Sequence, residues 1–143
     1  MEWTQRTELL LGAAEAEKLA KASVLIVGLG GVGGMAAEMI CRAGAGRITI
    51  VDADTVSSTN INRQIVALHS TLNRPKAEVL GERLLDINPE LKLVVINEML
   101  EEGNTEKLLS ENKFDFVVDA IDTLSPKVFL IKTCLERGIP IVS

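Results

Sequence analysis

Short apolar segments alternate with segments of helical periodicity along most of this chain. Apolar runs rich in β-branched residues predict buried strands at residues 24–28, 47–52, 91–97, 114–119 and 139–142. Apolar residues at helical spacing predict helices between these runs, at residues 31–42, 75–87, 104–111 and 126–137. Regular alternation of strand and helix requires parallel strands joined by right-handed crossovers. We therefore predict an α/β fold of the Rossmann-like type, a doubly wound, mostly parallel sheet with helices on both faces.

The two ends of the chain support different expectations. Residues 8–22 are rich in Ala, Leu and Glu, and Gly12 separates a short first turn from a helix near residues 13–20. The 143 residues suffice for one domain with a sizeable core. A strand has only just begun at Ile139, close to the last residue. We therefore expect residues 1–143 to be a single domain, the N-terminal portion of a longer protein and truncated at its C-terminal side.

A long irregular stretch separates the second predicted strand from the next helix. Residues 53–74 show no clear period and contain many polar groups. Pro75 suits the first turn of the helix that follows, and Asn104 suits the N-cap of a later helix. Structureless stretches of this length are uncommon inside compact domains and are usually functional. We therefore expect part of the chemistry to lie here.

A glycine cluster directly follows the first predicted strand. Gly28, Gly30, Gly31 and Gly33 join this strand to the first residues of a helix. Because glycine has no Cβ atom, its backbone N–H groups can approach an anion closely, and the positive end of the helix then faces that anion. The order strand, glycine turn, helix is typical of a nucleotide phosphate site. The sequence therefore predicts a nucleotide at these four glycines.

Two aspartates follow the second predicted strand. Asp52 lies about twenty residues beyond the glycines, where a carboxylate binds ribose hydroxyls in dinucleotide-binding folds. Asp54 either caps the loop or contacts the nucleotide. The glycines and Asp52 are compatible with NAD and with ATP, so they leave the nucleotide open.

The irregular stretch favours ATP. It contains Asn60, Arg63 and Gln64, and Lys76 begins the next predicted helix. Cleavage of a triphosphate builds negative charge on the departing pyrophosphate, which fixed cations stabilise, whereas an NAD-binding fold does not need these cations. Arg63 offers a planar fork for phosphate oxygens and Lys76 a point charge. The amides of Asn60 and Gln64 can orient phosphate or substrate.

Two further acids, Asp119 and Asp122, lie at the end of the fourth predicted strand. Ligands of an open parallel sheet bind outside the carboxyl ends of its strands. A carboxylate in this place can hold Mg²⁺ against the phosphates. Asp122 is the metal candidate, whereas Asp119 either contributes to the site or caps the loop.

Composition narrows the classes of function. The formal net charge of −5 argues against this segment alone acting as a nucleic-acid clamp, although a local basic patch is compatible with it. Cys41 and Cys134 form no CxxC pair, so neither a zinc site nor a disulfide framework is indicated. The sequence shows no signal-peptide pattern and no membrane-length apolar run. We therefore expect no membrane segment and a cytoplasmic location.

Five motifs together resemble the ThiF/MoeB/HesA adenylating enzymes, relatives of the ubiquitin-activating enzymes. The motifs are GLGGVG (28–33), VDADTV (51–56), NINRQ (60–64), RPK (74–76) and DAID (119–122). The resemblance extends over nearly the whole chain. Residues 60–71 and 119–127 are most similar to the branch of tRNA threonylcarbamoyladenosine dehydratases.

The resemblance implies ATP as the nucleotide and assigns roles to its neighbours. Asp52 would bind the ribose, Arg63 and Lys76 the phosphates, and Asp122 the Mg²⁺ ion. Arg6 matches the N-terminal arginine that reaches into the neighbouring subunit's site in this family, which implies a homodimer. The family often has Asn where this chain has Thr123, so one amide contact to the nucleotide differs.

The resemblance also implies a reaction, in which a carboxylate attacks the α-phosphate of ATP and forms an acyl-adenylate. In the dehydratase branch that carboxylate belongs to the threonylcarbamoyl group of a modified adenosine in tRNA, which then closes into a ring. In related branches it is the C-terminal glycine of a ubiquitin-like sulfur-carrier protein. Outside this family, the residues are also compatible with one half of an NAD-dependent oxidoreductase and with a nucleotide-binding scaffold that has no turnover.

Overall fold

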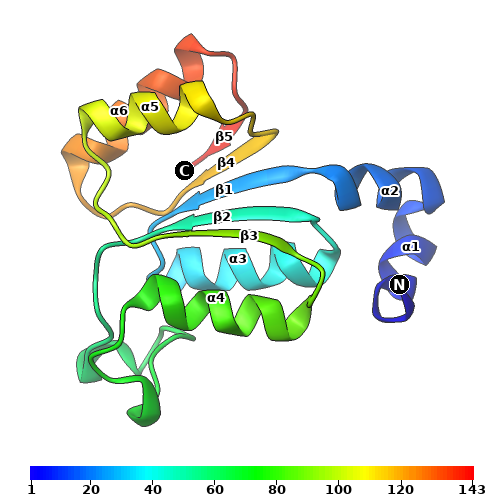
Figure 1. Ribbon diagram of the computed structural model, residues 1–143, viewed down its shortest axis with the longest axis horizontal. Coiled ribbons are helices and arrows are strands. Elements are labelled where there is room, and N and C mark those ends of the chain that lie inside the picture. The colour runs from blue at the N-terminus through cyan, green and yellow to red at the C-terminus, as the bar shows by residue number, and fades with distance from the viewer.

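A computed structural model describes residues 1–143 and shows five parallel strands in the order β3-β2-β1-β4-β5 (Figure 1). The strands are β1 (Ser23–Val27), β2 (Arg47–Val51), β3 (Lys92–Ile96), β4 (Phe116–Asp119) and β5 (Ile141–Val142). The helices are α1 (Gln5–Leu11), α2 (Ala13–Lys21), α3 (Gly31–Ala43), α4 (Lys76–Ile87), α5 (Glu102–Glu111) and α6 (Leu124–Glu136). Three short 3₁₀ turns complete the chain, η1 (Glu2–Thr4), η2 (Ser58–Asn60) and η3 (His69–Thr71). The predicted Rossmann-like fold is confirmed, and every strand pair is parallel.

The helices form a layer on each face of the sheet, as predicted. Figure 1 shows α3 and α4 beneath β1, β2 and β3, with α5 and α6 on the opposite face above β4 and β5. One apolar core lies on the α3 and α4 side and includes Ile26, Ile50 and Leu80. A second, smaller core lies on the other side and includes Leu25, Val117 and Leu130. Neighbouring residues of β1 thus face opposite layers, as the two-residue repeat of a strand requires.

The strand register brings three loops to one edge of the sheet. Val27 of β1 is opposite Val51 of β2 and also opposite Asp119 of β4. The loops that follow these strands therefore start at the same level, at the carboxyl ends of the strands. The order in which strands are added to the sheet reverses at β1, because β2 and β3 lie on one side of β1 whereas β4 and β5 lie on the other. This is the crevice where ligands bind in open α/β sheets.

Local signals explain most helix boundaries, with one correction. Gly12 separates α1 from α2, as predicted, and Gly44 ends α3 with a left-handed φ of 109°. The helix expected to begin at Asn104 instead begins at Glu102, with Glu101 as its N-cap. Asn104 accepts a hydrogen bond from the Glu101 backbone N–H at 2.6 Å, so its side chain stabilises the first turn from inside the helix.

The irregular stretch between β2 and α4 has the two short 3₁₀ turns η2 and η3 but no longer element. An isolated bridge between Thr55 and Pro75 ties its two ends together. None of the helices is both long and apolar enough to cross a lipid bilayer.

Candidate nucleotide-binding site

A cleft of about 190 Å³ lies at the carboxyl edge of the sheet. Its wall includes the glycine turn after β1, the loops after β2 and β4, and the start of α4. The residues predicted from the sequence that line it are Gly28, Gly30, Asp52, Asp54, Gln64, Lys76 and Asp122. Seven predicted residues from separate segments of the sequence therefore converge on one cavity.

The four glycines of the turn divide into two pairs. A Cβ atom at Gly28 would lie 2.5 Å from the Ala120 carbonyl oxygen, and one at Gly33 would lie 1.6 Å from the Gly28 carbonyl oxygen. Gly28 also has a φ of 91°. Packing of the turn therefore requires glycine at both positions, whatever binds in the cleft. At Gly30 and Gly31 the nearest atoms would lie at ordinary contact distances of 3.6 and 3.5 Å.

Asp52 joins the two loops that flank the cleft. One carboxylate oxygen accepts the Leu29 backbone N–H at 2.7 Å, and the other accepts the Asp54 backbone N–H at 2.7 Å. The side chain is half-buried. Each carboxylate oxygen can accept a second hydrogen bond, so Asp52 is able to bind a ribose hydroxyl while it holds the glycine turn in place.

Two buried polar side chains in the cleft lack full partners. Lys76 is only 6% exposed, and its Nζ lies 3.7 Å from the carboxylate of the exposed Asp54, which is longer than a hydrogen bond. Gln64 is 7% exposed, and its Oε1 has no hydrogen-bond partner. Buried polar groups in native proteins nearly always have a partner. A ligand with oxygen atoms and hydroxyl groups, such as a nucleotide, would supply what both side chains lack.

Arg63 and Asn60 lie outside the cleft wall. The Arg63 guanidinium is exposed and donates to the Thr59 carbonyl oxygen at 3.1 Å and to the Asn62 side chain at 3.0 Å. Its aliphatic part lies next to Gly31, at the rim of the glycine turn. The Asn60 side chain accepts the Ser57 backbone N–H at 2.9 Å and so caps η2. The phosphate roles expected for these two residues stay predictions.

Asp119 and Asp122 have different surroundings. Asp122 is exposed and lines the cleft, whereas the Asp119 side chain is fully buried. Asp119 accepts the Ile121 backbone N–H at 3.0 Å, the Lys127 ammonium at 2.6 Å and the Ser143 hydroxyl at 2.8 Å. Of the two roles that the sequence allows for Asp119, the geometry supports loop capping.

The sequence prediction missed several residues of this region. Lys127 neutralises Asp119 from the first turn of α6. Three residues that follow β3, namely Glu98, Met99 and Leu100, complete one side of the cleft. Their position directly after a strand is the same signal that identified Asp52, so this part of the wall could have been predicted.

Arg6 lies in α1, which packs against α2. Because α2 leads into the start of β1, α1 lies at the opposite end of the sheet from the cleft (Figure 1). The Arg6 side chain is exposed. Within one chain the structure therefore does not bring Arg6 to the nucleotide site.

The two cysteines take no part in the cleft. Both are buried, Cys41 on α3 and Cys134 on α6. Burial raises the pKa of each thiol, which disfavours the nucleophilic thiolate at neutral pH. Neither side chain is therefore suited to covalent transfer chemistry.

The profile of the ThiF family matches residues 4–143. The tRNA threonylcarbamoyladenosine dehydratase of Bacillus subtilis is 42% identical over 138 residues, covering 96% of this chain and 54% of that protein. Its counterpart in Escherichia coli is 41% identical over 144 residues, covering 99% and 53%. The molybdopterin-synthase adenylyltransferase of E. coli is 35% identical over 127 residues, covering 89% and 50%.

The fold has a near-identical counterpart among solved structures. The crystal structure of E. coli TcdA, a tRNA threonylcarbamoyladenosine dehydratase, in complex with ATP has a TM-score of 0.95 and 39% identity, covering 98% of this chain and 57% of that chain. The AMP complex of the same enzyme has a TM-score of 0.93 and 40% identity, covering 96% and 55%. The chain thus spans about half the length of the curated relatives it matches. It belongs to the ThiF family.

Proposed function

We propose that this chain is the nucleotide-binding part of an ATP-dependent tRNA threonylcarbamoyladenosine dehydratase. The observation that supports this most strongly is the cleft, in which buried Lys76 and Gln64 lack full partners beside the glycine turn. The dehydratases of B. subtilis and E. coli, at 42% and 41% identity, are more similar to this chain than the molybdopterin-synthase adenylyltransferase of E. coli, at 35%. The E. coli dehydratase also has structures in complex with ATP and with AMP.

The proposed reaction has two steps. A carboxylate oxygen of the threonylcarbamoyl group attacks the α-phosphorus of ATP, the bond between the α-phosphorus and the bridging oxygen breaks, and pyrophosphate leaves. In the second step, a nucleophilic atom of the same group attacks the activated carbonyl carbon and closes a ring, the bond from this carbon to the AMP oxygen breaks, and one proton is released with AMP, so that the group loses one water overall. Such transfers depend on positioning and charge stabilisation more than on covalent chemistry by the protein.

The residues of the cleft have distinct proposed roles. Asp52 binds the ribose with the lone pairs that its two backbone hydrogen bonds leave free. Lys76 stabilises the charge that develops on the phosphates, since its Nζ has no close partner. Gln64 orients the phosphate or the carboxylate, and the backbone at Gly30 and Gly31 faces the phosphates at the start of α3.

Arg63 requires a change of side-chain conformation to serve as a second phosphate contact. Its guanidinium is exposed, and both of its hydrogen-bond acceptors are neutral oxygens. A phosphate is a stronger partner for guanidinium than a carbonyl or amide oxygen. Nucleotide binding would therefore draw Arg63 from the rim toward the glycine turn, with Asn60 holding the adjoining loop through η2.

Asp122 is the proposed Mg²⁺ ligand. It is the exposed carboxylate on the β4 side of the cleft. The structure has no cluster of three or more His, Cys, Asp or Glu side chains that could bind a metal ion by themselves. Mg²⁺ commonly binds through one or two carboxylates together with substrate phosphates, so a single Asp fits this chemistry. When bound, the ion would offset negative charge on the phosphates.

A homodimer is the proposed assembly, because Arg6 matches the N-terminal arginine of the family and lies too far from the cleft to act within its own chain. In such a dimer Arg6 would reach the cleft of the partner subunit. Its substitution should then lower AMP formation without changing the fold.

The test is whether this protein converts ATP to AMP and pyrophosphate, and which acceptor it requires. We expect AMP to form when tRNA with threonylcarbamoyladenosine is added, and not with tRNA that lacks this group. Arg63→Ala should lower the rate at least about 100-fold, as the loss of one charge-stabilising group does, whereas the exposed Arg47→Ala should not.

Three results would contradict the proposal. AMP formation that requires a carrier protein ending in Gly-Gly would assign the protein to the sulfur-carrier branch. Tight binding of NAD together with indifference to ATP would indicate an oxidoreductase half. Nucleotide binding without turnover under every condition would indicate a scaffold.

A further inference from the structure

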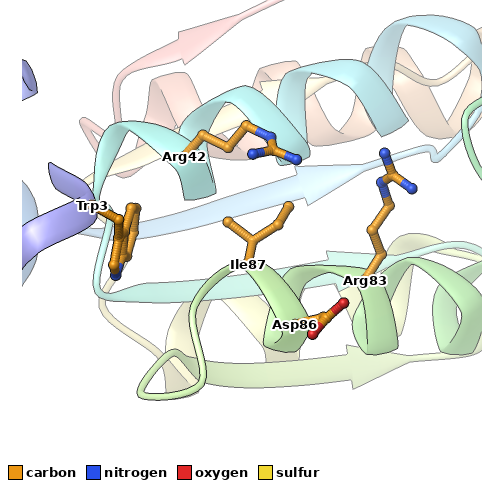
Figure 2. Close-up of a pocket in the computed structure, with 5 residues that line it drawn as sticks. All are labelled: Trp3, Arg42, Arg83, Asp86 and Ile87. Atoms are coloured by element: carbon orange, nitrogen blue, oxygen red, sulfur yellow. The ribbon is translucent and has the colours of Figure 1, made fainter.

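A second hollow, of about 510 Å³, lies at the far ends of α3 and α4 from the nucleotide cleft. It is lined by Trp3 of η1, Arg42 of α3, and Arg83, Asp86 and Ile87 of α4. Figure 2 shows Ile87 between Trp3 and Arg83, with the Arg42 guanidinium above it. The 13 residues of α3 extend roughly 20 Å at 1.5 Å per residue, so the hollow is separate from the cleft but on the same helix layer.

A buried carboxylate fixes both arginines of this hollow. Glu38 of α3 is 5% exposed. Its carboxylate accepts Arg42 Nε at 2.9 Å, Arg83 Nε at 2.5 Å and Arg83 Nη2 at 3.3 Å. The hydrogen bond from Arg83 holds the pKa of this carboxyl below its usual value, with a smaller contribution from Arg42. Glu38 therefore stays charged at neutral pH and holds two guanidinium groups in place.

Each arginine still has N–H groups to offer. Arg42 uses only its Nε, and Arg83 uses Nε and one terminal nitrogen. Two guanidinium groups that are already oriented lose less side-chain entropy on binding than free ones. The planar fork of arginine suits phosphate oxygens.

The hollow also has an apolar, aromatic side. Trp3 is 40% exposed, and Ile87 provides an adjoining apolar surface (Figure 2). Aromatic rings in combination with arginines are the typical binding surface for unpaired bases and their phosphates. The carboxylate of Asp86 can accept hydrogen bonds from an exocyclic amino group or a ribose hydroxyl.

We propose that this hollow is a docking site for an unpaired nucleotide of an RNA strand, with the base on Trp3 and the phosphate on Arg42 and Arg83. The assignment to RNA rests on the proposed function, because a tRNA substrate would supply the strand. The charges of Arg42 and Arg83 balance those of Glu38 and Asp86. The site therefore selects by shape and oriented hydrogen bonds, and not by bulk attraction, as suits a chain of net charge −5.

The chain contains a built-in reporter for this site. Trp3 is its one tryptophan, and there is no tyrosine, so intrinsic tryptophan fluorescence comes from the hollow alone. Titration with unmodified tRNA or a short single-stranded oligoribonucleotide, without ATP, should quench this fluorescence saturably. Bound RNA should also protect the ring from quenching by acrylamide. An absence of saturable quenching, or a ring that acrylamide cannot reach in the free protein, would overturn the proposal.

Matched variants locate the contact. Arg42→Gln should weaken RNA binding on the order of tenfold, the loss expected for one charge-assisted hydrogen bond. Arg83 keeps Glu38 paired in this variant, so the fold is retained. Arg47→Gln, outside the hollow, should have no effect. Trp3→Ala should weaken binding of labelled RNA in a filter assay, and Trp3→Phe should restore much of it. Equal binding by all four variants would contradict the site.

A cleft variant separates this inference from the proposed function. Lys76→Met should lower AMP formation at least about 100-fold yet leave quenching by RNA unchanged. If no AMP forms with any tRNA while quenching remains and depends on Arg42, the hollow stands as an RNA site and the proposed function fails. If Lys76→Met also abolishes quenching, the signal originates in the cleft and the hollow is not the docking site.

Discussion

The nucleotide cleft differs from the rest of the fold, which we call the framework, in whether its buried polar groups have partners within the chain. In the framework, Asp119 has three hydrogen-bond donors and Glu38 has two arginines. In the cleft, Lys76 has one carboxylate at 3.7 Å and Gln64 Oε1 has no partner. Both regions belong to the same sheet with its helices and loops, so the fold alone does not explain the contrast.

The contrast identifies where a ligand belongs. An unpaired buried polar group costs about 1–3 kcal/mol, and a protein retains such groups where they serve a function. The framework pairs hold the loops in position, whereas the cleft residues lack partners that the protein itself could provide. Substitution of a framework group should therefore lower the free energy of unfolding, whereas substitution of a cleft group should lower ATP binding or turnover.

The largest effect is expected at the ion pair between the buried Asp119 and the half-buried Lys127. Lys127→Met leaves the Asp119 carboxylate buried without its cation, which should lower the free energy of unfolding by about 3–5 kcal/mol. Adding Asp119→Asn removes the buried charge and keeps an oxygen for the Ile121 N–H, so stability should partly recover. Urea unfolding of the two single variants and the double variant measures this. A loss under about 1 kcal/mol for Lys127→Met would show that the pair behaves like a surface ion pair.

Lys76→Met should show the opposite behaviour. It removes a buried ammonium with no close partner, so the free energy of unfolding should stay constant or increase. AMP formation should fall at least about 100-fold, because a charge that stabilises the transition state is lost. The exposed Lys113→Met should change neither quantity. A Lys76→Met protein that is unstable but fully active would show that Lys76 serves stability, as the framework groups do, and not turnover.

Hydrophobic periodicity explains why the fold could be predicted. The five apolar runs correspond to the five strands, and the glycine turn and Asp52 could be placed because they follow strands whose carboxyl ends share an edge. Local spacing was sufficient for these features. It also placed Lys76 correctly at the first residue of α4.

Features that depend on side-chain packing and on the conformation of loops could not be predicted. The sequence did not distinguish Gly28 and Gly33, which packing requires, from Gly30 and Gly31. It also left Asp119 undecided, because the partner that neutralises it, Lys127, becomes a neighbour only when α6 returns to the sheet. The orientation of Arg63 depends on Thr59 and Asn62 in the same loop, which periodicity does not describe.

Gln64 offers a sharper version of the comparison, with a smaller effect. Gln64→Met keeps the length of the side chain but removes the unpartnered oxygen, so the free energy of unfolding should rise by about 1 kcal/mol. ATP affinity should fall about threefold to tenfold, because the nucleotide loses one neutral hydrogen bond. Gln5→Met, at an exposed position of α1, is the matched control. Thermal unfolding and ATP titration test both halves, and a destabilised Gln64→Met protein would mean that the oxygen has a partner in solution.

The smallest effect concerns the pH dependence of the framework through Glu38. Its pKa lies below the ordinary value of 4.5, mainly because Arg83 donates a hydrogen bond to it. A carboxyl with a lowered pKa in the folded state contributes stability above its unfolded pKa and loses that contribution as pH falls through the folded value. The difference in unfolding free energy between the wild-type protein and Glu38→Gln should therefore be constant from pH 7 to about 5 and shrink at lower pH.

The exposed acid Glu111 provides the control for this measurement, since it forms no ion pair and Glu111→Gln should change the free energy of unfolding by less than about 0.5 kcal/mol. A difference for Glu38→Gln that did not change with pH would mean that the carboxylate acts through packing and not through its charge. Glu38 would then not stabilise the framework through its charge. The ion pairs from Glu38 would also not be what orients Arg42 and Arg83 in the hollow beside Trp3.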